Sequence, residues 1–363
     1  MKRLMAALAG ILILASCSQQ RKEAQTINIE ENHAEGIDVE MLLGQGVKYI
    51  TLDTASNVPL IGRIQKAIIQ GSYIYISDYK SQHSFNLNGK YLTSLSKSGR
   101  GSGEYMSIAD FCVQDGTVYL YNNHKKLMAY NMQGECLNST ELDFYPASIT
   151  ILPEGNLLLT SAYQSDADKF HILSAKTLQR ERTFFPIDKA QITWRHFMGQ
   201  HNFYRMEEEL LFHEPMNDTI YTVQHNTLVP KYILNLYGEN APAKFYSKEY
   251  HDVMEIMMEA ASNGYAMGTP EFAEFPDAIV FTYKDAEKYR LCVYSKQYKT
   301  ALQSDTIRFK ALQYRESLEN CIFSFNGTQH QAIIFHGAQI PEKTKAAVLG
   351  VDADYDDIVI CFK

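Results

Sequence analysis

The stretch SKSGRGSGEYMSIADF, Ser96 to Phe111, places Arg100, Glu104 and Tyr105 among three glycines, and these side chains could contact a polar ligand. The glycine spacing matches that of loops that hold phosphate groups, but such a loop requires a helix to begin directly after the glycines. Here the next residues alternate like a strand and continue into DGTVYLYNN. The pattern therefore does not predict a nucleotide site, and we expect no cofactor.

The acidic run DADYDD, Asp352 to Asp357, has the alternating carboxylates of a calcium loop, because Ca²⁺ prefers several oxygen ligands. Asp357 stands where such a loop needs glycine, and Lys363 stands where it needs a bidentate glutamate. We therefore expect a solvated acidic turn. The 11 histidines form no His-Glu-x-x-His motif, so no metal site is expected elsewhere.

Four more residues could reach a ligand from loops, namely Trp194 in TWRHF and His213, Asn217 and Asp218 in HEPMNDT. Aromatic faces bind sugars and cations, but a single tryptophan also serves in core or rim packing. The residues of HEPMNDT also suit an ordinary turn after a strand. No serine lies in a nucleophile elbow and no set of proton-transfer groups stands out, so we expect no catalytic residue.

The start of the chain indicates export. A basic pair, Lys2 and Arg3, precedes the apolar run LMAALAGILILA of 12 residues, which is too short to span a bilayer and is typical of a secretory signal. The run ends in LASC, which resembles the lipobox of bacterial lipoproteins. Cleavage would remove residues 1–16 and leave Cys17 lipidated. An ordinary cleavage site with a chance cysteine is the alternative.

An acylated Cys17 would tie the protein to a lipid bilayer. We expect the outer membrane of a Gram-negative bacterium, with the protein facing the periplasm or the cell surface. Residues 17–40 are assigned to the lipidated cysteine and a flexible tether, because Ser18 to Glu35 are mostly polar. The formal charge of -8 becomes more negative when the two cations of the signal are removed, which argues against a nucleic-acid partner.

Residues 41–363 are expected to form one repeat domain. GSYIYISDYKSQHSFNLNG from Gly71 aligns without a gap on GTVYLYNNHKKLMAYNMQG from Gly116, at an offset of 45 residues. Each copy has two strands within it and one on either side, and looser copies follow to the C-terminus. Repeats of this length with four strands predict an all-β fold, a six-bladed β-propeller of four-stranded blades.

Two further features complete this prediction. VKYITLD, Val47 to Asp53, and DIVICFK, Asp357 to Lys363, should share the last blade, because an open ring would expose a strand edge. SKEYHDVMEIMMEAAS, Ser247 to Ser262, has apolar residues at helical spacing and should form one inserted helix, near 247–262.

The chain resembles the lipid-anchored six-bladed β-propeller family of gut bacteria, whose fold is related to NHL-repeat and TolB-type propellers. The resemblance rests on GRGSGEY followed by SIADFCV, on NDTIYTVQHNTLVPKYILNL, and on an acidic turn before the last apolar strand. The family usually has proline where Ser102 stands, and Asn-Pro where YDD stands, Tyr355 to Asp357. The resemblance implies the propeller fold and no particular activity.

In such a propeller the glycine loop joins the outer strand of one blade to the inner strand of the next. It either only makes this turn, with Arg100 and Glu104 paired locally, or it presents Arg100, Glu104 and Tyr105 to a ligand at the channel mouth. We favour a non-enzymatic binding or scaffold module for a glycan, a peptide or a protein partner. The alternative is a propeller enzyme, a lyase or hydrolase, acting at the central channel.

Overall fold

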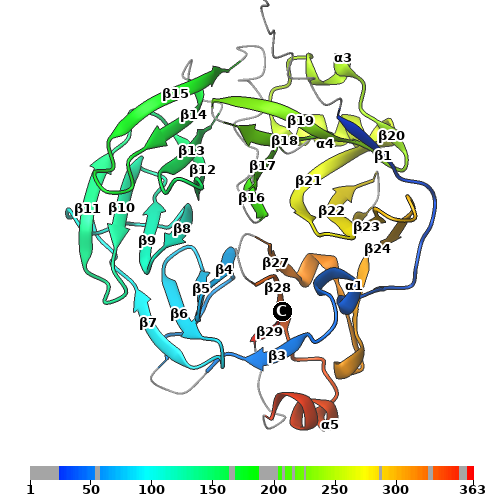
Figure 1. The fold of residues 1–363 in the computed structure, drawn as a ribbon, viewed down its shortest axis with the longest axis horizontal. Helices are drawn as coiled ribbons and strands as arrows, with labels where there is room; N and C mark the ends of the chain where they lie inside the picture. Colours follow the sequence, from blue (N-terminus) through cyan, green and yellow to red (C-terminus); the bar gives the residue numbers. More distant parts are fainter. Residues whose placement is uncertain are drawn as a thin grey trace, which may run out of the picture.

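Strands dominate the computed structural model, which describes residues 24–53, 58–162, 168–187, 203–206, 209–214, 217–224, 226–285, 288–325, 330–350 and 358–363. They form seven sheets that surround a central axis, as Figure 1 shows. The molecule is an all-β propeller.

The first three sheets follow one another along the chain, and each has four antiparallel strands. Sheet 1 contains β4 (Lys66–Gln70), β5 (Tyr73–Ser77), β6 (Gln82–Asn86) and β7 (Tyr91–Leu95). Sheet 2 contains β8 (Asp110–Gln114), β9 (Thr117–Tyr121), β10 (Lys126–Tyr130) and β11 (Cys136–Glu141). Sheet 3 contains β12 (Pro146–Ile151), β13 (Leu157–Ser161), β14 (Asp168–Leu173) and β15 (Arg180–Pro186).

The next two sheets have five strands each. Sheet 4 contains β16 (Phe203–Met206), β17 (Glu209–His213), β18 (Thr219–Gln224), β19 (Thr227–Asn235) and the N-terminal β1 (Gln25–Asn28). Sheet 5 contains β20 (Glu239–Asn240), β21 (Tyr265–Glu274), β22 (Ala278–Lys284), β23 (Tyr289–Ser295) and β24 (Ala301–Ser304).

The last two sheets combine strands from both ends of the chain. Sheet 6 has three strands, β2 (Ile37–Asp38), β25 (Thr306–Phe309) and β26 (Tyr314–Ser317). Sheet 7 has four strands, β27 (Ile322–Ser324), β28 (Ala332–His336), β29 (Ile358–Phe362) and β3 (Lys48–Thr51).

The prediction of six blades with four strands each is wrong. Counted by its sheets, the propeller has seven blades, and these have three, four or five strands. The unexpected sheet 6 takes its strands β25 and β26 from the part of the chain between the last strand of sheet 5 and the first strand of sheet 7. Its strand β2 has only two residues, which is too short to carry a periodic pattern.

Closure of the ring through the chain ends is confirmed. β3 pairs antiparallel with β29, and the register places Thr51 opposite Val359 and Lys48 opposite Phe362. The edge of β29 is therefore covered by a strand from the other end of the chain.

The described part of the predicted tether belongs to the propeller. β1 pairs in parallel with β19, and Ile27 within it is fully buried. β2 pairs in parallel with β25, where Ile37 is also fully buried. The assignment of residues 24–40 to a flexible tether is therefore corrected, because isolated isoleucines in a polar segment are enough to anchor these short strands.

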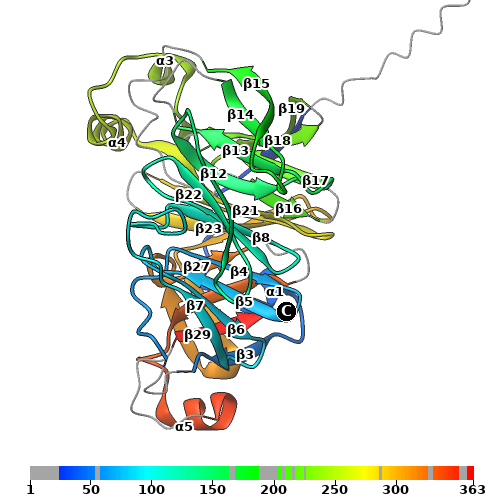
Figure 2. The same ribbon diagram turned by 90° about the vertical axis from the view of Figure 1, so that its left-hand side faces the viewer.

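The predicted insertion is confirmed, but its main helix is shorter. α4 (Val253–Ser262) begins where Asp252 accepts a hydrogen bond from the amide of Glu255 at 2.9 Å, and a short α3 (Ala243–Tyr246) precedes it. Both lie at one edge of the propeller (Figures 1 and 2). The other helical turns are α1 (Val39–Leu43), η2 (Lys310–Leu312), η3 (Leu318–Asn320), α5 (Glu342–Thr344) and η4 (Lys345–Leu349). Among the described residues, no helix is long and apolar enough to cross a membrane.

The core lies between the faces of neighbouring sheets. Phe170 of sheet 3 packs edge-on against Phe212 of sheet 4, with ring centroids 5.0 Å apart. Phe309 of sheet 6 stacks on Phe335 of sheet 7 at 4.2 Å. Such contacts make each blade depend on its neighbours, and they hold the inner strands in place around the axis.

Candidate functional site

The glycine loop is closed by its own hydrogen bonds. The Glu104 carboxylate accepts a hydrogen bond from the amide of Gly101 at 2.8 Å, and the Lys126 ammonium donates to the carbonyls of Gly101 and Glu104. A bridge between Ser98 and Tyr105 folds the loop back on itself. The loop therefore has a defined shape without any ligand.

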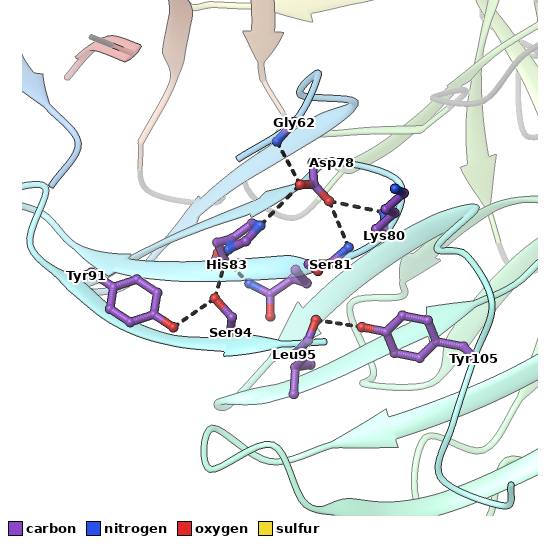
Figure 3. A network of polar contacts seen from close by, with 10 residues as sticks. Gly62, Asp78, Lys80, Ser81, His83, Tyr91, Ser94, Leu95 and Tyr105 are labelled. Atoms are coloured by element: carbon purple, nitrogen blue, oxygen red, sulfur yellow. Dashed lines mark hydrogen bonds and ion pairs between the residues drawn. The ribbon is translucent and has the colours of Figure 1, made fainter. Parts of the chain in front are cut away.

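The three side chains of this loop that were expected to contact a ligand differ in their exposure to solvent. Arg100 and Glu104 are exposed, and no ion pair between them is present. Tyr105 is only 1% exposed, and its hydroxyl donates to the carbonyl of Leu95 at 2.6 Å, as Figure 3 shows. Tyr105 thus faces the core, because the folded-back loop turns it inward.

His213, Asn217 and Asp218 lie at the ends of β17 and β18, where they bond to nearby groups. The buried imidazole of His213 lies 2.6 Å from the carbonyl of Asn217. The Asn217 side chain accepts from the amide of Thr219 at 3.0 Å, and Asp218 accepts from Asn240 at 2.9 Å. These hydrogen bonds are those of an ordinary turn after a strand, which was the alternative to a ligand contact in the sequence analysis. Trp194, Cys17 and residues 352–357 lie outside the described residues.

A serine, a histidine and an aspartate form a chain in sheet 1 that sequence reasoning missed (Figure 3). His83 Nδ1 lies 2.8 Å from Ser94 Oγ, and His83 Nε2 lies 3.4 Å from Asp78 Oδ2. Tyr91 donates to the same Ser94 oxygen at 2.9 Å. A serine, a histidine and an aspartate are linked in the same order in the catalytic triad of hydrolases. Burial and hydrogen bonding must therefore decide whether these three residues are catalytic or structural.

Burial and bonding favour a structural role for this chain of residues. The side chains of His83 and Asp78 are 1% and 8% exposed. Burial lowers the pKa of His83 despite the neighbouring carboxylate, so the imidazole is neutral. Burial would raise the pKa of Asp78, but hydrogen bonds from the amides of Gly62 and Ser81 hold it below its usual value. Asp78 thereby ties the segment before β4 to the turn after β5.

A hollow on the described surface lies where sheets 3, 4 and 5 meet, and we call it the blade-4/5 cleft. It encloses about 1030 Å³ of space, including its open mouth. Its polar lining comes from the ends of strands and the turns after them, and comprises Glu209, Thr222, Gln224, Glu274 and Lys296. Leu210, Val223 and Phe275 add apolar surface. Such a mixed lining suits a ligand with both polar and apolar faces.

An ion network connects three charged lining residues of the cleft, Glu209, Glu274 and Lys296, through Lys231 beside them and joins sheets 4 and 5. Lys231 Nζ lies 2.5 Å from Glu209 Oε2 and 2.6 Å from Glu274 Oε2. Lys296 Nζ lies 2.7 Å from Glu274 Oε1, and the hydroxyl of Tyr232 donates to the same oxygen at 2.6 Å. Two carboxylates face two ammonium groups, so the network is neutral overall.

The network holds Glu274 and Lys231 in their charged forms. Burial would raise the pKa of Glu274, but hydrogen bonds from Lys231, Lys296 and Tyr232 lower it below its usual value. Burial would lower the pKa of Lys231, but its bonds to Glu209 and Glu274 raise it. Glu274 is therefore not poised to exchange a proton near neutral pH, and its carboxylate is better suited to hydrogen bonding than to acid–base chemistry.

No signal in the sequence pointed to this network. Glu209 and Glu274 are far apart along the chain and meet only because two sheets pack side by side. Charged residues near strand ends are normally solvated, so they were not singled out. Among the residues that the structure covers, no group of three or more His, Cys, Asp or Glu could hold a metal ion.

Comparison with known proteins gives a family and a fold. The family described as Domain of unknown function (DUF4934) matches residues 24–340. A crystal structure of a Bacteroides fragilis NCTC 9343 protein that is assigned as exported has a TM-score of 0.68 and 15% identity, over 93% of this chain and 99% of that chain. A catalytically inactive variant of virginiamycin B lyase from Staphylococcus aureus, with quinupristin, has a TM-score of 0.44 and 11% identity, over 87% and 98%. No curated protein matches. The chain belongs to this family, and the likeness to the Bacteroides fragilis structure shows the fold alone.

Proposed function

Because the chain belongs to the DUF4934 family and folds as an all-β propeller, we propose that it is an exported, lipid-anchored binding module. The signal-like residues 1–16 and the lipobox-like LASC support lipidation at Cys17. The similar Bacteroides fragilis structure, assigned as exported, supports a location outside the cytoplasm. The outer membrane as its site and a relation to NHL and TolB propellers are parts of this proposal that rest on the sequence resemblance.

The blade-4/5 cleft is the proposed binding site. The observation that carries this proposal is the neutral ion network, in which Glu209, Glu274, Lys231 and Lys296 offer both acceptors and donors without net charge. A ligand without net charge that carries many hydroxyl groups matches this surface, since each hydroxyl can both donate and accept. We therefore propose that the cleft binds a neutral glycan. A peptide or a protein partner is the competing ligand class.

Two variants of the cleft test this proposal by glycan array and calorimetry. Gln224 is exposed and lines the cleft, and Lys296 can be replaced while Glu274 keeps its bonds to Lys231 and Tyr232. Gln224→Ala and Lys296→Gln should each weaken glycan binding by roughly tenfold, as expected for a lost hydrogen bond to a charged or polar group. Their melting temperatures should stay near that of the parent.

Lys90→Gln is the matched control, because Lys90 is exposed on sheet 1, away from the cleft lining. It should bind the same glycans with the parental affinity. Unchanged binding in both cleft variants would refute the assignment of the cleft. Binding of peptides but of no glycan would refute the ligand class while leaving the cleft as the site.

A further inference from the structure

A second cavity lies in the central channel, between the inner strands β4, β8, β12 and β16. It encloses about 520 Å³, including its open ends. Its polar lining consists of Lys66, Gln70, Cys112, Ser148, Thr150 and Arg205. No lining residue is shared with the blade-4/5 cleft, and no lining residue is a carboxylate. The channel is therefore a separate site of different electrostatic character.

Arg205 is the unusual residue of this lining. It lies on β16 opposite Leu210, and its side chain is half-buried. Its Nε is buried without a hydrogen-bond partner among the described residues, and none of their carboxylates pairs with its guanidinium. Buried donors in native proteins are normally satisfied, so an unpaired guanidinium beside a cavity indicates a group that completes it.

The other cation of the channel is already neutralised. Lys66 Nζ lies 2.6 Å from Asp110 Oδ1 and donates to the carbonyl of Phe111 at 2.8 Å. Asp110 also accepts from the amide of Ile149 at 3.0 Å and lies 3.3 Å from Ser148 Oγ. This ion pair therefore joins sheets 1, 2 and 3 and leaves no net charge on its wall of the channel.

The remaining lining groups add no negative charge. Burial raises the pKa of the Cys112 thiol well above its usual value, so this group stays protonated. Gln70 and Thr150 can each donate a hydrogen bond. Arg205 thus leaves a net positive charge in the channel of a chain whose formal charge is -8.

We propose that the central channel binds a small oxyanion, a carboxylate or phosphate group, through Arg205. The guanidinium offers a planar fork of donors that matches two oxygens of either group. Gln70 and Thr150 supply further donors from β4 and β12. The cleft proposal does not depend on this site, and this site does not depend on the cleft.

The test is calorimetric titration of the full mature protein with inorganic phosphate and with acetate, at low ionic strength. The parent should bind at least one of them with a dissociation constant on the order of 1 mM or tighter. Arg205→Met should weaken binding by about tenfold or more, because a charged hydrogen-bond donor is lost. Arg205→Lys should bind with intermediate affinity, since it keeps the charge and loses the fork.

Arg63→Met is the matched control, because Arg63 is exposed and does not line the channel. It should bind like the parent. Binding of phosphate alone would assign a phosphate group, and binding of acetate would assign a carboxylate. The proposal is overturned if Arg205→Met binds as tightly as the parent, or if the parent binds neither anion. Arg205→Lys keeps the test decisive should the methionine variant not fold.

Discussion

Replacing His171 with phenylalanine should flatten the pH dependence of folding stability on the acid side of neutrality. His171 lies on β14, where its ring is 1% exposed and stacks on Phe144 at a centroid distance of 3.6 Å. Its Nε2–H donates to the carbonyl of Asp168 at 2.9 Å, and its Nδ1 is buried without a hydrogen-bond partner among the described residues. A proton on Nδ1 would therefore be a buried charge without a direct partner.

The structure sets the size and sign of this effect. Burial lowers the pKa of His171 from 6.5 to about 4, although the carbonyl of Asp168 opposes the shift. Between pH 6.5 and about 4, His171 binds a proton in the unfolded chain but not in the folded chain, so the free energy of unfolding falls as the pH drops through this range. Below about pH 4 both states bind the proton, and the loss levels off. Between pH 7 and pH 5 this single group should cost about 2 kcal/mol in the free energy of unfolding.

Urea unfolding at both pH values measures the effect. In His171→Phe the loss between pH 7 and pH 5 should be about 2 kcal/mol smaller than in the parent. The carbonyl of Asp168 keeps a hydrogen bond from Ser161 Oγ at 2.8 Å, so the substitution leaves it satisfied. His124→Asn, which removes an exposed histidine, is the control for the loss of an imidazole as such. Equal losses in His171→Phe and the parent, or an imidazole resonance that titrates near pH 6.5, would refute this reasoning.

Two further predictions concern the anchor and the glycine loop. Cys17→Ala should abolish incorporation of a fatty-acid analogue in metabolic labelling, and equal label in variant and parent would contradict lipidation at this cysteine. Gly99→Ala should destabilise the fold by about 1 to 3 kcal/mol in urea unfolding, because its φ is +158° and a Cβ there would lie 2.0 Å from Glu104 Oε2. Gly101→Ala should cost less, since Gly101 does not have a positive φ and its Cβ would lie farther from the same Glu104 carboxylate, at 3.0 Å; equal costs would contradict this account.

The strand repeat was predictable because its turns and its strands carry independent signals. Gly71 and Gly89 of the first copy, and Gly116 and Gly134 of the second, all have positive φ in the structure. Glycine is favoured at such positions, so the same spacing recurs in both copies. The number of sheets was not predictable in this way. Sheet 6 depends on a two-residue strand whose partner lies far along the chain, and pairing of that kind leaves no local pattern.

The candidate sites were less predictable than the fold for a related reason. Lys231 of sheet 4 meets Glu274 of sheet 5 only through the packing of the two sheets, and this contact connects Glu209 to Glu274. Arg205 differs from other arginines only in what surrounds it, and its neighbours come from other blades. Tyr105 illustrates the converse, because its place beside exposed charged residues suggested a ligand contact while the loop geometry directs it into the core.

The N-terminal segment links the proposed anchor to the proposed binding face. The amide of Ile29 donates to the carbonyl of Asn235 at 2.9 Å, and the amide of Ala34 donates to that of Gln303 at 2.8 Å, so the segment runs along sheets 4 and 5. Gln25, the first residue of β1, stands eight positions after Cys17 in the sequence. Even a fully extended chain of that length reaches only about 30 Å. A lipidated Cys17 would therefore hold Gln25, at the β1 edge of sheet 4, within that distance of the membrane surface, whereas a free tether of residues 17–40 would have allowed several times this reach.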